Sequence, residues 1–366
     1  MTHDKTLKAP ADRIPSVVLG ATGLVGQRLV AMLARHPWFR LAGVAASERH
    51  AGRQYGEVVQ WRIEGEAPSE AAALRLARPT PDDCPPATLV FSALPALEAQ
   101  AVEPAFARAG AFVSSNASAF RMQPDVPLVI PEINPDHLSA LANQRELRQW
   151  TGSLVTNPNC STIGLALALA PLARFGIERV MVTTLQAASG AGYPGVASLD
   201  LIDNVIPFIA GEEEKIETET RKILGVWQDG AFVDAPIRLS AQTTRVPVRE
   251  GHLACVSVKF AQIPQPEDIL AAWQEFSGLP QRLGLPTAPR QVLRYLDAPD
   301  RPQPHYDRDA EGGMGVTLGR LRRCAVLDYR FICLSHNTIR GAAGAALLNA
   351  ELAYARGLLA TSGRSA

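Results

Sequence analysis

The sequence predicts an α/β protein in which an N-terminal, doubly wound parallel sheet is followed by a second domain. Three observations support this fold class. A short apolar strand at residues 16–19 runs directly into a glycine-rich turn and a helical pattern. Strand and helix patterns then alternate to about residue 114, as in parallel sheets built from βα units. Finally, 366 residues suffice for two domains, each with its own core.

Composition and charge are those of a globular protein. Apolar residues make up 47% of the chain, and Lys plus Arg and Asp plus Glu number 36 each, so no basic excess attracts nucleic acid or a membrane surface. The five cysteines have no CxxC spacing, which argues against a disulfide framework and a zinc site, and no other metal constellation occurs. Residues 1–15 lack the apolar core of a signal peptide, so we expect a flexible leader on a cytoplasmic protein.

The glycine-rich turn GATGLVG occupies residues 20–26, between the first strand and its helix. Glycines permit a tight turn and a close backbone approach, so a pyrophosphate can sit at the helix N-terminus. This context predicts a Rossmann-like dinucleotide site rather than an ordinary βα turn. The candidate cofactor-binding residues are Gly20, Thr22, Gly23, Leu24 and Val25.

The second strand, residues 41–46, ends where an NAD-binding domain usually places a carboxylate on the ribose. Here Ser47 and Arg49 follow, and a hydroxyl and a guanidinium suit a 2′-phosphate, so NADP is favoured over NAD. Glu48 keeps an NAD-type contact open. The next strand, residues 89–91, leads to Ser92 at the rim of the predicted nucleotide crevice.

The end of the first domain carries one candidate cation. Arg121 follows the strand at residues 111–114, where it either binds an anion at the sheet rim or is an ordinary surface charge. Residues 125–134 read as an extended connection and residues 135–150 as a helix. We therefore place the domain boundary near Thr156.

Cys160 stands where the polar turn Asn157-Pro158-Asn159 becomes a buried helical run, residues 163–173. A thiol at a helix start faces unpaired N–H groups and the positive end of the helix dipole, which favour a nucleophilic thiolate near neutral pH. The alternative is an inert, buried cysteine. The flanking Asn, Ser and Thr favour the nucleophile.

The second domain supplies further polar candidates around this thiol. The strand at residues 179–185 ends at Gln186, which is either a site residue or a water-facing strand end, and a small-residue loop with Gly190 follows. Residues 204–225 include Glu212 and Lys215. An acidic helix start is ordinary dipole compensation, so Lys215 is the less usual of the two.

Arg245 and His252 lie seven residues apart in the strand-like segment 241–260, so a turn at Glu250-Gly251 is needed to bring them together. With a candidate thiol elsewhere, a Cys/His partnership competes with a structural histidine. Residues 262–304 read as an irregular insertion. Strands at 316–320 and 324–333 precede Asn337, which opens an Ala-rich helix able to pack on the first domain.

Seven motifs along the chain resemble, in order, those of aspartate-semialdehyde dehydrogenases of the archaeal and fungal-like branch. They are GATGLVG, SSNASAFRM, NPNCST, QAASGAG, PFIAGEEEKIETET, RVPVREGH and HNTIRGAAGA. The resemblance spans residue 16 to about residue 360. It implies an NADP-binding domain at residues 16–156, completed by a C-terminal helix at residues 337–366. It also implies an α+β catalytic and dimerisation domain with a mixed sheet at residues 157–336.

The resemblance further implies a reaction: NADP- and phosphate-dependent interconversion of aspartate semialdehyde and β-aspartyl phosphate, toward lysine, threonine and methionine. Cys160 would be the nucleophile, Gln186 would orient the acyl-enzyme, and His252 would be the acid/base. Substrate would be held by four further residues: Arg245 on the carboxylate, Glu212 on the ammonium, and Arg121 and Lys215 on the phosphoryl group. Gly190 and Asn337 would join the cofactor-binding residues, and the family also implies a homodimer or homotetramer.

Two other classes of function remain at this stage. One keeps the chemistry with another substrate, as in malonyl-CoA reductase or N-acetylglutamyl-phosphate reductase; Glu212, Arg121 and Lys215 favour a small amino-acid acyl phosphate. The other is a non-enzymatic nucleotide-binding protein with a degenerate site. The joint presence of Cys160 and His252 with their companions argues against it.

Overall fold

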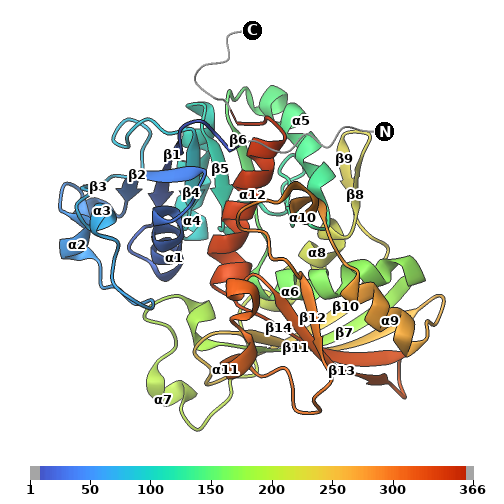
Figure 1. The fold of residues 1–366 in the computed structure, drawn as a ribbon. Helices are drawn as coiled ribbons and strands as arrows, with labels where there is room; N and C mark the ends of the chain where they lie inside the picture. Colours follow the sequence, from blue (N-terminus) through green and yellow to red (C-terminus); the bar gives the residue numbers. More distant parts are fainter. Residues whose placement is uncertain (1–8, 360–366) are drawn as a thin grey trace.

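The first sheet of the computed structural model, which describes residues 9–359, is six-stranded and entirely parallel, in the order β3-β2-β1-β4-β5-β6 (Figure 1). The order reverses between β1 and β4, the point where α/β sheets bind ligands. Its strands are β1 (Ile14–Leu19), β2 (Phe39–Ala45), β3 (Leu76–Ala77), β4 (Leu89–Ser92), β5 (Phe112–Ser115) and β6 (Ser153–Thr156). Its helices are α1 (Leu24–Ala34), α2 (Tyr55–Val58), α3 (Ser69–Ala72), α4 (Ala96–Arg108) and α5 (Ala140–Arg148). The predicted doubly wound fold is confirmed.

The second sheet is mixed, in the order β10-β7-β11-β14-β13-β12. Its strands are β7 (Ile177–Gln186), β10 (Arg238–Arg245), β11 (His252–Phe260), β12 (Leu293–Leu296), β13 (Val316–Arg323) and β14 (Tyr329–Ser335). Buried and partly exposed residues alternate along β11, because helices cover one face of this sheet. These helices include α6 (Cys160–Leu169), α8 (Glu212–Ile223) and α9 (Pro266–Gln274).

Smaller elements complete the second half of the chain. They are the hairpin β8 (Val226–Gln228) and β9 (Ala231–Val233) and the short helices α7 (Ser198–Leu201), α10 (Leu279–Leu283) and α11 (Pro304–Asp307). The expectation of an irregular insertion at residues 262–304 is wrong, because this segment contains α9, α10 and β12. The prolines of this segment predicted breaks in the chain, but Pro266 lies in the first turn of α9, where its missing N–H leaves no helix hydrogen bond unmade.

The last helix, α12 (Gly344–Ala355), follows a π-helical turn at Ile339–Ala343 and joins the core of the first sheet. It is buried from Gly344 to Ala353, and the Ser114 Oγ of β5 donates a hydrogen bond to the Ala346 carbonyl. In Figure 1 this helix runs between the two sheets. The thiol-bearing α6 and the glycine turn of α1 are thereby held within one body.

The domain boundaries stay predictions. Most of the expected leader lies outside the described residues, and β1 already begins at Ile14. The expected helix at residues 337–366 is shorter, because α12 ends at Ala355, and residues 360–366 lie outside the described residues. Within residues 9–359, no helix has the length and apolar character needed to span a membrane.

Candidate active site

Cys160 is the first residue of α6, as the sequence predicts. The Asn159 side chain caps this helix by accepting hydrogen bonds from the N–H groups of Ser161 and Thr162, at 2.9 and 3.3 Å. All residues from Ser161 to Leu169 are buried, so the helix has no freedom to rotate. The cap and the buried helix together fix the position of the sulfur.

His252 is the partner of this thiol. It begins β11 directly after Gly251, whose φ of 101° makes the turn that the sequence requires. Its Nε2 lies 3.2 Å from Cys160 Sγ, and its Nδ1 accepts a 3.0 Å hydrogen bond from the Ala187 N–H. Because a backbone N–H only donates, the neutral ring carries its proton on Nε2, facing the sulfur.

Burial dominates the electrostatics of this pair. It raises the pKa of the Cys160 thiol to about 12, with Glu212 adding to the effect and Arg121 and Arg245 opposing it. Burial also lowers the pKa of His252 to about 3, assisted by the positive charge of Arg245. At rest the pair is therefore a neutral thiol and a neutral imidazole. This differs from the expected thiolate, because desolvation outweighs the helix terminus.

Arg245 and Gly190 border the same space. Arg245 ends β10, is buried, and donates through Nη1 to the Ala187 carbonyl at 2.7 Å. A Cβ on Gly190 would lie 2.7 Å from that Nη1 and 3.0 Å from the His252 ring. The small-residue loop after β7 is thus explained by its close approach to both side chains.

Glu212 ties the start of α8 to the cysteine turn. Its carboxylate accepts hydrogen bonds from Asn159 Nδ2 at 3.0 and 2.9 Å, from Lys215 Nζ at 3.0 Å and from Gln186 Nε2 at 3.4 Å. Gln186 is buried at the end of β7, so it does not face water. Glu212 therefore does more than compensate the dipole of its helix.

Arg121 is a buried residue and not a surface cation. Its Nη1 donates to Glu219 at 3.0 Å and its Nη2 to the Asn116 carbonyl at 2.7 Å. The other Glu219 oxygen accepts the Asn159 N–H at 2.6 Å. Sequence reasoning missed Glu219, although it lies seven residues after Glu212, on the helix face that also carries Lys215.

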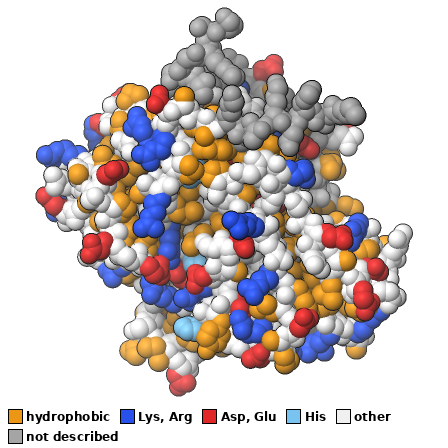
Figure 2. Space-filling view, viewed as in Figure 1, with side chains coloured by type: hydrophobic (Ala, Val, Ile, Leu, Met, Phe, Trp, Pro, Cys, Tyr) orange, Lys and Arg blue, Asp and Glu red, His pale blue; other side chains and the backbone are white. Residues whose placement is uncertain are grey.

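The glycine turn borders a cavity of about 420 Å³. Gly20 has a φ of 72°, and a Cβ on Gly26 would lie 2.2 Å from the Gly20 carbonyl oxygen, so the turn and its close packing against α1 require glycine at both positions. The cavity is lined by Thr22, Leu24, Gln27, Arg49, His50, Val58, Gln60, Arg62 and Tyr193. This lining contains cations and no carboxylate. On the side of the first domain that Figure 2 shows, Lys and Arg side chains alternate with Asp and Glu side chains.

The predicted cofactor-binding residues divide into three groups. Thr22, Leu24 and Arg49 line the cavity, and Gly20 and Gly23 form its turn. The remaining candidates are not among its lining residues: Val25, Ser47, Ser92, Gly190 and Asn337. Two of these approach the Cys/His pair instead, since Gly190 contacts His252 and Asn337 Oδ1 accepts the Gly251 N–H at 2.8 Å.

Arg62 also lines this cavity, although no sequence motif predicted it. Its Nη2 donates to the Tyr193 hydroxyl at 2.7 Å, and its guanidinium lies 4.1 Å from the centre of the Tyr193 ring. Tyr193 belongs to the loop after β7, so this pair brings the second domain over the cavity. The glycines of the loop were the sequence signal for a close approach.

The fold and the Cys/His site are those of a dehydrogenase with a dinucleotide-binding half and a thiol-bearing half. Residues 17–141 match the family model described as the NAD binding domain of semialdehyde dehydrogenases, and residues 169–340 match the model of their dimerisation domain. The chain belongs to the aspartate-semialdehyde dehydrogenase family. It is 50% identical to the aspartate-semialdehyde dehydrogenase of Archaeoglobus fulgidus over 92% of this chain and 96% of the relative. It is 47% identical to that of Cryptococcus neoformans, over 96% of this chain and 100% of the relative.

Solved structures agree with this assignment. The crystal structure of the Candida albicans aspartate-semialdehyde dehydrogenase with NADP matches with a TM-score of 0.86 at 39% identity, over 95% of this chain and 100% of that one. A Vibrio cholerae aspartate-semialdehyde dehydrogenase complexed with ASA matches with a TM-score of 0.74 at 26% identity, over 94% and 99%.

Proposed function

We propose that the chain catalyses the NADP-dependent reductive dephosphorylation of L-aspartyl 4-phosphate to L-aspartate 4-semialdehyde, and its reverse, through a thioester on Cys160. The proposal rests above all on the 3.2 Å approach of Cys160 Sγ and His252 Nε2, close to Arg245 and Glu212. A thiol, an acid/base and groups of both charges are what an acyl transfer on an amino acid requires. The family relationship selects the aspartyl substrate.

NADP fits the residues of the cavity. Arg49, His50 and Arg62 offer cationic or hydrogen-bonding groups to a 2′-phosphate or pyrophosphate, and no lining carboxylate repels them. No side chain caps α1 at Gly23, so the N–H groups at this helix start can donate to a phosphate. When bound, NADP supplies hydride transfer at the carbon held by the cysteine.

The proton on Nε2 gives His252 a directional role. Its N–H faces the sulfur, so it hydrogen-bonds to the cysteine anion and relays the thiol proton to the substrate oxygen. The proton on Nε2 passes to that oxygen while the thiol proton takes its place, so the ring is neutral before and after the transfer. Gln186, held by Glu212, orients the acyl group on Cys160.

Substrate binding is assigned to four residues around the thiol. Arg245 holds the substrate carboxylate, because its guanidinium presents paired donors close to His252. Glu212 receives the ammonium group. Arg121 and Lys215 bind the phosphoryl oxygens, with Lys215, the more exposed of the two, reaching the incoming phosphate.

The assembly we propose is a cytoplasmic homodimer or homotetramer. The face of the mixed sheet away from α6 supports it, because Met181 there is 55% exposed and no described helix covers it. The family model over this sheet is that of a dimerisation domain.

A spectrophotometric assay tests the function. The purified chain, given aspartate semialdehyde, phosphate and NADP, should form reduced cofactor, and omission of phosphate should stop turnover. Turnover that requires coenzyme A instead of phosphate would assign the chain to acyl-CoA reduction and overturn the proposal.

A further inference from the structure

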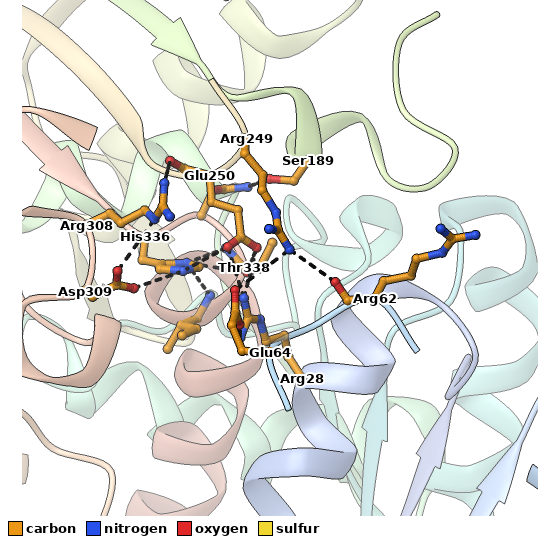
Figure 3. A network of polar contacts seen from close by, with 12 residues as sticks. Arg28, Arg62, Glu64, Ser189, Arg249, Glu250, Arg308, Asp309, His336 and Thr338 are labelled. Carbon is orange, nitrogen blue, oxygen red and sulfur yellow. Dashed lines mark hydrogen bonds and ion pairs between the residues drawn. The ribbon is translucent and has the colours of Figure 1, made fainter. Parts of the chain in front are cut away.

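A buried polar network joins α1 of the first domain to the turn that precedes His252 (Figure 3). Arg28, one turn into α1, donates through Nη2 to both oxygens of Glu250, at 3.1 and 3.0 Å. Glu250 also accepts a 3.1 Å hydrogen bond from Thr338 Oγ1 and lies 3.5 Å from His336 Nε2. Three separate segments of the chain therefore meet on one carboxylate.

Glu250 is a fixed negative charge. It is 3% exposed. Burial alone would raise the pKa of this carboxyl, but the hydrogen bond with His336 and the charge of Arg28 lower its pKa to about 2. Four other charged groups lie nearby: Arg308 donates to the Glu250 carbonyl at 3.4 Å, Glu64 pairs with Arg28, Arg249 lies 3.8 Å from Glu64, and Asp309 lies 3.7 Å from His336. The carboxylate therefore stays ionised in the folded protein near neutral pH, where it can hold its three partners Arg28, Thr338 and His336.

The network controls where β11 begins. Gly251, the residue between Glu250 and His252, has a left-handed φ of 101° and donates its N–H to Asn337 Oδ1 at 2.8 Å. Asn337 in turn donates to Ser189 Oγ at 2.8 Å. With Glu250 and Gly251 both anchored, the backbone of His252 has a defined start, and its ring has a defined distance to the sulfur.

We propose that Glu250 is a positioning residue for His252 and that Arg28 is the latch that holds it from the cofactor-binding domain. Arg28 is adjacent to Gln27, which lines the dinucleotide cavity, but is not itself a lining residue. The acid/base is thus positioned by the same helix that receives the pyrophosphate. The inference rests on the proposed function for the role of His252.

The test compares Glu250→Gln with Glu64→Gln. Both changes remove a carboxylate that pairs with Arg28, but Glu64 is an exposed partner, with a side chain 63% exposed. We expect Glu250→Gln to lower kcat by about 10- to 100-fold, the loss that follows from misplacing a catalytic group by about 1 Å. The dissociation constant for NADPH should stay within about twofold. Glu64→Gln should leave kcat within about twofold of wild type.

A second readout does not depend on the substrate. The rate at which iodoacetamide alkylates Cys160, followed against pH, reports the placement of His252 beside the sulfur. It should fall in Glu250→Gln and recover in part in Glu250→Asp, which keeps the charge. If the wild type showed this alkylation pattern but no turnover of aspartate semialdehyde, the proposed function would be wrong and the positioning role of Glu250 would still hold.

The same measurements are made on Arg28→Gln and on the double variant Arg28→Gln/Glu250→Gln. Arg28→Gln replaces Glu250→Gln in the test should the latter fail to fold. Because both residues act through one contact, the double variant should be no slower than the slower single variant. If the fold losses in kcat of the two single variants multiply in the double variant, Arg28 does not act through Glu250. Wild-type kcat and alkylation in a folded Glu250→Gln, or a loss of NADPH binding in parallel with kcat, would overturn the positioning role.

Discussion

Replacing His252 separates the two tasks that its Nε2 performs. Asn can place its amide near the position of Nδ1 but does not reach Nε2, whereas Gln reaches that position and donates a hydrogen bond without transferring a proton. His252→Asn therefore loses both tasks, and His252→Gln loses proton transfer alone. The Nε2–Sγ distance of 3.2 Å makes the comparison meaningful.

The expected magnitudes follow from this contact. A hydrogen bond to a charged group contributes about 1.5–3 kcal/mol, so losing it should lower the thiolate fraction of Cys160 by about 10- to 150-fold. General acid/base catalysis contributes about 10²- to 10⁴-fold. We expect His252→Asn to show both losses, and His252→Gln to lose kcat by about 10²- to 10⁴-fold with near wild-type thiol reactivity.

The assay is alkylation by iodoacetamide with the modified peptides quantified by mass spectrometry, alongside steady-state kinetics. Because burial raises the pKa of Cys160 to about 12, its alkylation rate should rise with pH throughout the neutral range. Cys160→Ser is the control, since the peptide that contains residue 160 should then carry no label.

Two outcomes would refute this reasoning. Equal alkylation rates at Cys160 in wild type and His252→Asn would mean that the Nε2 contact does not stabilise the thiolate. A rise in KM with unchanged kcat would make His252 a binding residue.

Three further predictions concern the phosphate, the cofactor and the fold. Lys215→Ala should raise KM for phosphate and leave KM for aspartate semialdehyde unchanged. The control Lys259→Ala, which breaks a surface pair with Glu178, should change neither KM. Equal effects of Lys215→Ala on both substrates would show that Lys215 is not part of the phosphate site. Arg49→Ala should erase most of a roughly ten- to hundredfold preference for NADP over NAD in kcat/KM, and a wild type that uses NAD equally well would point to Glu48 as the ribose contact. Glu132→Gln removes the charge partner of the fully buried Arg340 and should lower the free energy of unfolding in urea by about 3–5 kcal/mol. The control Asp136→Asn, at the exposed partner of Arg356, should lower it by under about 1 kcal/mol. Similar losses in both variants would contradict the claim that burial makes the Glu132–Arg340 pair costly to break.

Local chemistry made much of the site predictable. The cap at Asn159 and the turn at Gly251 are properties of short segments, so the position of Cys160 at a helix start and the turn before His252 follow from a few neighbouring residues. The same holds for the glycine turn before α1.

Contacts between distant segments were not predictable in this way. Arg28 and Glu250 are 222 residues apart, and Arg121 and Glu219 are 98 apart, so no local pattern indicates either pair. Burial is also a property of the whole fold, which is why the resting state of the thiol differs from the expectation based on its helix alone. Three elements within residues 262–304 were missed because their prolines read as breaks.

The central claim is that Cys160 carries the aspartyl group as a thioester, and a burst experiment without phosphate tests it most directly. With aspartate semialdehyde and NADP but no phosphate, the enzyme should form about one reduced cofactor per site and then stop, with the acyl group on the peptide containing Cys160. Cys160→Ser, which still binds NADP, should show neither burst nor modification. Continued turnover without phosphate, or a burst with Cys160 unmodified, would contradict the account.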